Sequence, residues 1–420
     1  MPSKNNYSLI GDVAEIRSGF GFPIRFQGRT AGDLPFAKVG DISKTVKNGF
    51  SEIGSADHYV DYSELKELKA KTFPVGTIVF AKIGEAIRQN FRAITSTEML
   101  FDNNVMGLVP KTSKVNAKFL FHFLKSIDLY KLANATSVPS IRRSDIEQIR
   151  IYLPPLPEQK RIAEVLDKAD ALREKRRLAL QKLDTLLQSV FLEMFGDPVK
   201  NPKGWNVEPL RNLIDDSRPI TYGILKPGDN VKNGVPYIRV VDMKDGEILV
   251  DEVRKTTKTI ANEYKRSTLK SGDLLMSIRG HVGRLAIVPE ILEGANITQD
   301  TARLAPNNKC NVHYLHDCLK SVYFQRELRR YVKGVAVQGI NLGDVKELKI
   351  PVPPLTLQEK FASISLTFRK SRYKSVKARK MSENLFQSLQ QRAFKGELFS
   401  NESLTVEPQE GKVRQQTSLF

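Results

Sequence analysis

The stretch from residue 153 to residue 196 begins LPPLPEQKRIAEVLDKAD and ends LLQSVFLEMFG, and it decides the fold. Its prolines impose an extended start, and Pro157 suits the first turn of a helix. From there to Phe195 no proline or glycine occurs, and apolar residues recur at the three- and four-residue spacings of a coiled-coil seam. Gly196 then ends the helix. At 1.5 Å per residue the pattern predicts a rod about 57 Å long, and its apolar stripe requires a partner.

The partner is predicted within the same chain, because the stretch occurs twice. Residues 352–361 read VPPLTLQEKF where residues 153–162 read LPPLPEQKRI, an offset of 352 − 153 = 199. Three upstream phrases are also repeated: PFAKVGD (35–41) as PYIRVVD (236–242), GTIVFAKIG (76–84) as GDLLMSIRG (272–280), and FLFHFLKS (119–126) as YLHDCLKS (314–321). The chain is therefore a unit of about 200 residues written twice.

The repeat predicts an α+β protein with two tandem mixed α/β domains and two long helices. The expected boundaries are residues 1–152 for the first domain, 153–200 for the first long helix, 201–350 for the second domain, 351–398 for the second long helix, and 399–420 for a disordered tail. Two similar units tend to pack about a pseudo-two-fold axis. The two long helices should therefore form an antiparallel coiled coil, with one domain at each end of the rod.

Shorter elements are predicted inside the first domain. Leu34–Val39, Thr77–Ile83 and Val105–Val109 have the pattern of strands, and Tyr62–Lys71 and Lys118–Ala133 have the pattern of helices. The second domain should repeat this order.

Composition limits the class of protein. The 420 residues carry a net charge of +19, which favours an anionic partner, with nucleic acid the leading candidate. Two cysteines exclude a disulfide framework and favour a reducing compartment. We find neither a signal peptide nor an apolar run of membrane-spanning length, so we expect a soluble, cytoplasmic protein.

With its two-fold repeat, its PPLPEQ-type helix starts, its two divergent domains and its basic charge, the chain resembles the specificity subunits of type I restriction-modification systems. The resemblance covers about residues 9–398. The second copy departs from the pattern, since Thr356 and Leu357 stand where the first has Pro157 and Glu158.

The resemblance implies that each domain is a target-recognition domain reading one half of a split, asymmetric DNA sequence, while the helices set the unread spacer. It also implies a non-catalytic chain that binds double-stranded DNA, two methyltransferase subunits acting on adenine N6, and two restriction (translocase-nuclease) subunits. S-adenosylmethionine, ATP and Mg would then belong to those partners, and this chain would bind no cofactor. The residues agree, because the sequence contains no Walker-type phosphate loop and no Asn-Pro-Pro-aromatic or Asp-Pro-Pro-aromatic tetrapeptide.

Candidate DNA contacts lie in matched loops of the two domains. Arg pairs bidentately with guanine, Asn or Gln pairs with adenine, and all of them can hold phosphate. An ordinary basic hairpin is the alternative reading. The candidates are Lys38, Lys82, Arg88, Gln89, Asn90, Arg92, Arg142 and Arg143 in the first domain, and Arg239, Arg279, His281, Arg284, Gln338 and Asn341 in the second. Lys38 and Arg239 are expected to occupy matched positions on a repeated strand.

The long helices carry basic runs near their middles. A charge run is usually a solvated face, but it could also contact the DNA backbone or a partner subunit. The candidates for such contacts are Arg176, Arg177, Arg372, Lys374 and Lys377.

A zinc site is a competing interpretation of Cys310, His313, His316 and Cys318. The repeat opposes it, because His316 aligns with Phe121 and Cys318 with Phe123, so a helix face with a buried cysteine is favoured.

Two other functions compete with a non-catalytic DNA reader. One is a self-contained DNA-modifying enzyme, which S-adenosylmethionine- or Mg-dependent activity of the isolated chain would reveal. The other is a non-specific nucleic-acid-binding coiled-coil scaffold, which would ignore DNA sequence. The divergence of the two domains favours a sequence-specific DNA-binding protein, since two identical domains would serve a non-specific scaffold equally well.

Overall fold

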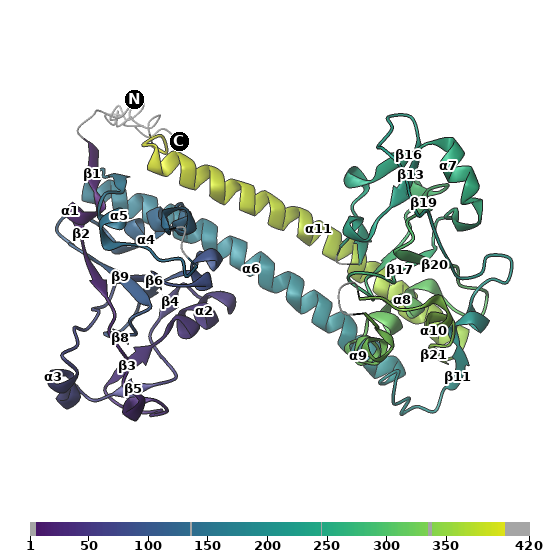
Figure 1. Ribbon diagram of the computed structural model, residues 1–420, viewed down its shortest axis with the longest axis horizontal. Helices are drawn as coiled ribbons and strands as arrows, with labels where there is room; N and C mark the ends of the chain where they lie inside the picture. The colour runs from purple at the N-terminus through teal and green to yellow at the C-terminus, as the bar shows by residue number, and fades with distance from the viewer. Residues whose placement is uncertain (1–5, 135–136, 245, 335–337, 400–420) are drawn as a thin grey trace, which may run out of the picture. The chain divides into compact units, whose positions relative to one another are not determined.

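The computed structural model describes residues 6–134, 137–244, 246–334 and 338–399 (Figure 1). The chain divides into two compact units, one formed by Met1–Arg177 with Lys377–Phe420 and the other by Leu178–Val376. Most of the predicted tail lies outside the described residues. No helix within the described part of the chain is both long and apolar enough to span a bilayer.

The two predicted long helices are confirmed. Helix α6 covers Leu156–Phe195 and α11 covers Leu355–Phe394, 40 residues each (Figure 1). Glycines with positive φ follow both helices, at +80° for Gly196 and +74° for Gly396. Each helix contributes one half to each unit, and the two helices pack together within each unit.

Within each unit the two helix halves run antiparallel. In unit 1, Arg173 of α6 donates a hydrogen bond to Glu383 of α11 (2.9 Å), and Arg176 bonds to the Ala378 carbonyl. Contacts thus move backward along α11 as they move forward along α6.

Unit 2 shows the same direction at the other halves of the helices. Arg372 bonds to Asp184 (3.1 Å), and the Phe361 ring lies 5.4 Å from the rings of both Phe191 and Phe195.

Unit 1 builds its domain from short strands and helices around a five-stranded sheet of order β2-β9-β6-β7-β4 and a three-stranded sheet of order β5-β3-β8. Its elements are β1 (Tyr7–Leu9), α1 (Ile10–Val13), β2 (Ala14–Ser18), η2 (Ile24–Phe26), β3 (Leu34–Ala37), α2 (Val39–Lys47), β4 (Glu52–Ile53), β5 (Tyr59–Val60), η3 (Tyr62–Glu64), α3 (Leu65–Leu68), β6 (Ile78–Ala81), η4 (Glu85–Gln89), β7 (Arg92–Thr95), β8 (Leu100–Phe101), β9 (Val105–Pro110), α4 (Ala117–Lys125), η5 (Leu129–Leu132), α5 (Arg143–Glu147) and β10 (Arg150–Tyr152).

Unit 2 repeats this plan with a four-stranded sheet of order β12-β20-β17-β18 and a three-stranded sheet of order β16-β13-β19. Its elements are β11 (Asn206–Pro209), η6 (Leu210–Leu213), β12 (Thr221–Tyr222), β13 (Val235–Ile238), η7 (Val240–Asp242), β14 (Met243–Lys244), β15 (Glu247–Ile248), η8 (Val250–Glu252), β16 (Arg254–Thr256), α7 (Lys258–Glu263), η9 (Lys265–Ser267), β17 (Leu274–Ser277), β18 (Leu285–Ile287), η10 (Glu290–Leu292), β19 (Asn296–Ile297), β20 (Thr301–Leu304), α8 (Val312–Lys320), α9 (Val322–Leu328), η11 (Arg329–Tyr331), α10 (Leu342–Lys346) and β21 (Lys349–Val352).

The strand pairings confirm the internal repeat. β3 runs parallel to β8, with Phe36 opposite Leu100, and β13 runs parallel to β19, with Tyr237 opposite Asn296. In both units the strand after the Gly-bounded turn pairs antiparallel with a later strand, β6 with β9 and β17 with β20.

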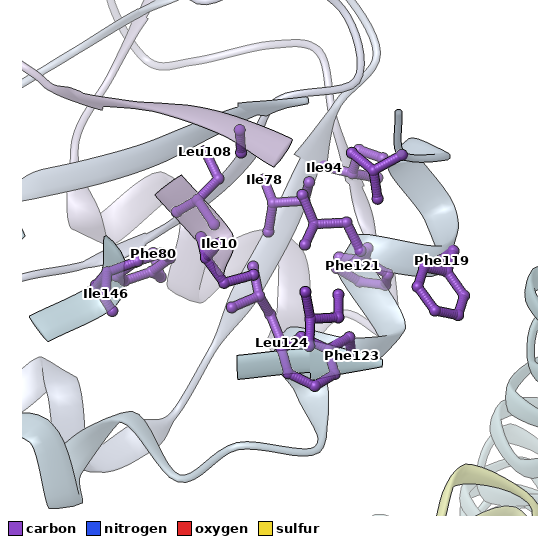
Figure 2. Close-up of a cluster of buried hydrophobic side chains, with 14 of the residues drawn as sticks. Ile10, Ile78, Phe80, Ile94, Leu108, Phe119, Phe121, Phe123, Leu124 and Ile146 are labelled. Carbon is purple, nitrogen blue, oxygen red and sulfur yellow. The ribbon is translucent and has the colours of Figure 1, made fainter. Parts of the chain in front are cut away.

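The core of unit 1 forms between the five-stranded sheet and α4. Ile78 and Phe80 of β6 and Leu108 of β9 are fully buried with Leu120 and Leu124 of α4 (Figure 2). Ile162 and Leu166 of α6 join this core, together with Phe386 and Ala393 of α11. The apolar stripe of α6 therefore has two partners, the domain and the second long helix.

Two predicted helices are shorter than expected. The Tyr62–Lys71 helix is wrong in length, because η3 and α3 stop at Lys69, whose φ of +49° is left-handed. The Lys118–Ala133 helix stops at Lys125, where the Ser126 hydroxyl bonds back to the Phe123 carbonyl.

Candidate nucleic-acid interface

The structure brings together two loops of each unit that the sequence identified separately. In unit 1 the Gly84 amide donates to the Pro139 carbonyl (2.8 Å), and the Ile141 amide donates to the Lys82 carbonyl (2.9 Å). In unit 2 the Gly280 amide donates to the Gln338 carbonyl (2.8 Å), and the Ile340 amide donates to the Ile278 carbonyl (2.9 Å). The segment after β6 or β17 thus lies beside the segment that leads into α5 or α10. We call these two adjoining segments the paired-loop frame of each unit.

Matched glycines keep this frame open. Gly84 has a φ of +82° and Gly280 a φ of +71°, a conformation that L side chains rarely adopt. A Cβ built on either would meet no atom within 4 Å, so the space in front of both backbones is free.

Several unit 1 candidates are exposed on this frame. Arg88 pairs with Glu85 (2.7 Å) and lies 4.2 Å from the centre of the Tyr130 ring, while Gln89 is exposed beside it. Arg142 and Arg143 are also exposed, and Arg143 pairs with Glu147 (2.7 Å). Lys82 is half-buried, and burial lowers the pKa of its ammonium group.

Two unit 1 candidates use their hydrogen bonds internally. The Arg92 side chain is 5% exposed and donates to the Asn90 and Ile127 carbonyls, and burial lowers its pKa to about 10. Asn90 has a φ of +53°, and its Oδ1 accepts from Arg92 (2.9 Å) and from the Leu129 amide (3.0 Å). Together they fix the loop to the segment after α4.

The matched pair Lys38 and Arg239 lies just past the strands. The prediction that both stand on a strand is wrong, because β3 ends at Ala37 and β13 at Ile238. Each instead begins a helical turn, and its amide donates to a carboxylate three residues on, Asp41 (2.7 Å) or Asp242 (2.9 Å). This cap ends the strand.

Their side chains are also engaged. Lys38 Nζ donates to Gln27 (3.0 Å), whereas Arg239 pairs with Asp242 through two nitrogens, at 3.0 and 2.6 Å.

The unit 2 candidates divide in a similar way. Arg279, His281, Gln338 and Asn341 are exposed, and the Arg279 guanidinium donates to Gln299 Oε1 (3.2 Å). Arg284 is half-buried and donates to the Val240 carbonyl (3.2 Å).

On the long helices, three of the five basic candidates are paired. Arg176 bonds to the Ala378 carbonyl and the Ser382 hydroxyl, which ties α6 to α11 within unit 1. Arg177 pairs with Glu174 (2.6 Å) and Arg372 with Asp184 (3.1 Å). Lys374 and Lys377 are exposed.

Sequence reasoning missed a pair of buried glutamines at the helix starts. Gln159, 1% exposed, donates to the Lys114 (3.1 Å) and Pro154 (2.8 Å) carbonyls and accepts from the Asn116 amide (2.8 Å). Gln358, 0% exposed, makes the matching bonds to Lys309 (3.2 Å), Pro353 (2.8 Å) and Asn311 (2.8 Å). The repeated sequence contained the signal, since 358 − 159 = 199.

The cysteine and histidine cluster of the zinc interpretation lies on and next to α8. His316 Nδ1 lies 2.7 Å from Arg369 and 2.8 Å from Asp317, and burial lowers the pKa of this imidazole to about 4. Burial also raises the pKa of the Cys310 thiol to about 12 and raises that of Cys318, which disfavours thiolate ligands. Within the described ranges no group of three or more His, Cys, Asp or Glu is arranged to hold a metal ion.

A duplicated chain, with two mixed domains and two long helices that run antiparallel within each unit, defines the class of DNA-specificity subunits. The family model "Type I restriction modification DNA specificity domain" matches residues 2–182 and 212–380. The chain belongs to this family, and it is a non-catalytic specificity subunit of a type I restriction-modification enzyme.

Curated relatives support the assignment over nearly the full length. The chain is 29% identical to the type I restriction enzyme EcoBI specificity subunit of Escherichia coli over 420 residues, covering 93% of this chain and 85% of that protein. It is 22% identical to the MjaIX specificity subunit of Methanocaldococcus jannaschii over 398 residues, covering 87% and 86%.

The fold is also similar to a solved structure. The crystal structure of the type I restriction-modification S subunit from M. genitalium matches with a TM-score of 0.58 at 16% identity, covering 94% of this chain and 98% of that one.

Proposed function

We propose that the chain reads a split, asymmetric DNA target, with residues 1–152 reading one half-site and residues 201–350 the other. The observation that carries this proposal is the paired-loop frame, which is the same in both units while its side chains differ. Unit 1 presents Arg88, Gln89 and Arg142 around the frame, and unit 2 presents Arg279, His281 and Gln338. One frame carrying two sets of donors suits two different base sequences.

The candidate residues take different parts in this proposal. The exposed ones contact bases or phosphates: Arg88, Gln89, Arg142, Arg143, Arg279, His281, Gln338 and Asn341. Lys82, Lys38 and Arg239 contact phosphate. Asn90, Arg92 and Arg284 position the loops, because their hydrogen-bonding groups face backbone carbonyls or each other.

The long helices bind partners and set the spacer. In this proposal the chain works in the cytoplasm and holds two adenine-N6 methyltransferase subunits and two restriction-translocase subunits. Those partners bring S-adenosylmethionine, ATP and Mg. The exposed Lys374 and Lys377 contact the DNA backbone or a partner, while Arg176, Arg177 and Arg372 are held by bonds within their own units.

The decisive experiment is a map of adenine methylation on DNA from cells that express this chain with its methyltransferase subunit. We expect a motif with two defined halves and a fixed gap, which is absent without this chain. Methylation that is independent of sequence, or a motif that persists when the chain is omitted, would contradict the proposal. Methyl transfer by the isolated chain would instead favour a self-contained enzyme.

A further inference from the structure

A strand-to-strand turn lies against the paired-loop frame in both units, and sequence reasoning did not single it out. In unit 1 this turn joins β8 to β9, and the Lys82 amide donates to the Asn104 carbonyl (2.8 Å). In unit 2 it joins β19 to β20, and the Ile278 amide donates to the Asp300 carbonyl (2.8 Å). Each frame therefore consists of three adjoining segments.

The turns match residue by residue. Asn104 and Asp300 differ by 300 − 104 = 196, the same offset that relates Gly84 to Gly280 (280 − 84 = 196). The residue before each is an amide side chain, Asn103 in unit 1 and Gln299 in unit 2. Both units therefore place a carboxamide side chain at the same point beside the paired-loop frame.

The structure leaves these amides available. Asn103 is exposed, and its side chain has no hydrogen-bond partner among the residues that the structure describes. Gln299 is half-exposed, its backbone amide is held by the Ile224 carbonyl (2.9 Å), and its Oε1 accepts from Arg279 (3.2 Å). Neither side chain is needed to close its own turn.

Each amide has a carboxylate beside it in the chain, and Gln299 also has the Arg279 guanidinium 3.2 Å away. Asp102 precedes Asn103, and Asp300 follows Gln299, so an acidic residue adjoins each amide in the chain. A carboxylate disfavours the approach of a phosphate but leaves a neutral base edge accessible. The free space in front of Gly84 and Gly280 permits such an approach.

We propose that Asn103 and Gln299 are base-reading residues, one for each half-site, a proposal that rests on the DNA-reading function above. In unit 1 the residue matched to Arg279 is Ile83 (279 − 83 = 196), whose side chain is apolar, so Asn103 keeps both its donor and its acceptor and matches the N6 and N7 atoms of adenine. In unit 2 the Gln299 Oε1 already accepts a hydrogen bond from Arg279, the residue matched to Ile83. The Arg279–Gln299 pair therefore presents donors, which match N7 and O6 of guanine.

The test replaces each amide in the full chain and maps adenine methylation in cells carrying the methyltransferase subunit. For Gln299→Ala we expect about tenfold or greater loss of discrimination at one guanine position of one half-site. For Asn103→Ala we expect the same loss at one adenine position of the other half-site. The untouched half and the gap should stay as in the wild type, which shows that each variant is folded.

Asn262→Ala is the matched control, since it removes an exposed amide from α7 in unit 2 and should leave the motif intact. If the wild-type chain gives a split motif and both alanine variants give that same motif, this inference is overturned while the reading function stands. If the wild-type chain gives no split motif, the reading function itself fails.

A second measurement covers a variant that no longer supports methylation. The purified complex with the methyltransferase subunit is tested against the target duplex and duplexes with single base changes. Lost discrimination at one position supports the proposal. Equal weakening on every duplex, with discrimination unchanged, overturns it.

Discussion

At the scale of single residues, Gln159 and Gln358 explain which part of the repeated phrase is indispensable. The second copy replaces Pro157 and Glu158 by Thr356 and Leu357, yet it keeps the glutamine. The side-chain amide of each glutamine forms hydrogen bonds with the turn before α4 or α8 and with the segment that starts its own long helix. A single buried amide thus joins domain to helix in both units.

We therefore predict that Gln159→Ala destabilises unit 1 by about 1–3 kcal/mol, because it leaves the Asn116 amide and two carbonyls without their partner. Gln358→Ala should cost unit 2 a similar amount. Chemical denaturation measures both. Glu164→Ala, at an exposed position of α6, is the control and should change the unfolding free energy little. A Gln159→Ala protein that unfolds like the control would show that the buried bonds contribute nothing.

The residue scale also shows where sequence reasoning stops. Asn90 and Arg92 carry the donors of a base reader, and the sequence grouped them with the other candidate residues of their loop. The Ile127 carbonyl that both bond lies 35 or more positions along the chain. No periodicity or spacing reports such a contact, so the sequence could not separate these loop-fixing residues from the exposed Arg88 and Gln89.

At the scale of elements, one charge pair between domain and long helix is reversed between the two units. In unit 1 cationic or basic side chains of α4 meet carboxylates of α6: Lys118 to Asp167 (3.1 Å), His122 to Asp167 (2.7 Å) and Lys125 to Asp170 (2.7 Å).

In unit 2 the residue matched to His122 is Asp317 of α8, and the residue matched to Asp170 is Arg369 of α11 (369 − 170 = 199). The Arg369 guanidinium lies 3.4 Å from the Asp317 carboxylate. Burial opposes the charge of Asp317, but His316, Arg369 and the Ser365 hydroxyl outweigh it, and the pKa of this carboxyl is lowered. At this position Asp317 suits Arg369 and would meet a like charge at Asp170 of the other helix, whereas Lys125 and its counterpart Lys320 are basic in both units.

We predict that His122→Asp destabilises unit 1 by about 1–3 kcal/mol, since it places a buried carboxylate against Asp167 and Asp170. Adding Asp167→Arg should recover part of this loss by restoring opposite charges. A double-mutant cycle followed by denaturation measures the coupling, which we expect to be about 1 kcal/mol or more. Strictly additive effects of the two substitutions would refute the charge matching.

Elements differ in how well the sequence predicted them. The start of the first long helix was predicted to within one residue, Pro157 against Leu156, because forty residues of apolar periodicity leave little choice. The α3 and α4 segments were predicted too long. Their ends depend on single local events, the left-handed Lys69 and the Ser126 turn, against a helical pattern that continues in the sequence.

At the scale of the whole molecule, the repeat links the two units through both helices. The first half of α6 pairs with the last half of α11 in unit 1, and the remaining halves pair in unit 2. The boundary between the two units falls between Arg177 and Leu178 in α6 and between Val376 and Lys377 in α11. Helix length between these domains is the quantity that we expect to set the unread gap of a split target.

A change of helix length tests this expectation directly. Four residues inserted at Ala179 of α6 add slightly more than one helical turn, so the apolar face is nearly preserved while the helix lengthens by about 6 Å. We predict that the gap in the methylation motif grows by about two base pairs, at 3.4 Å per step, while both half-sites keep their sequences.

The matching insertion in α11 is at Ala378 (378 − 179 = 199), and the doubly extended chain should show the same longer gap with better stability. A motif with its original gap, read by a chain that carries the insertion in both helices, would mean that something other than helix length spaces the two half-sites.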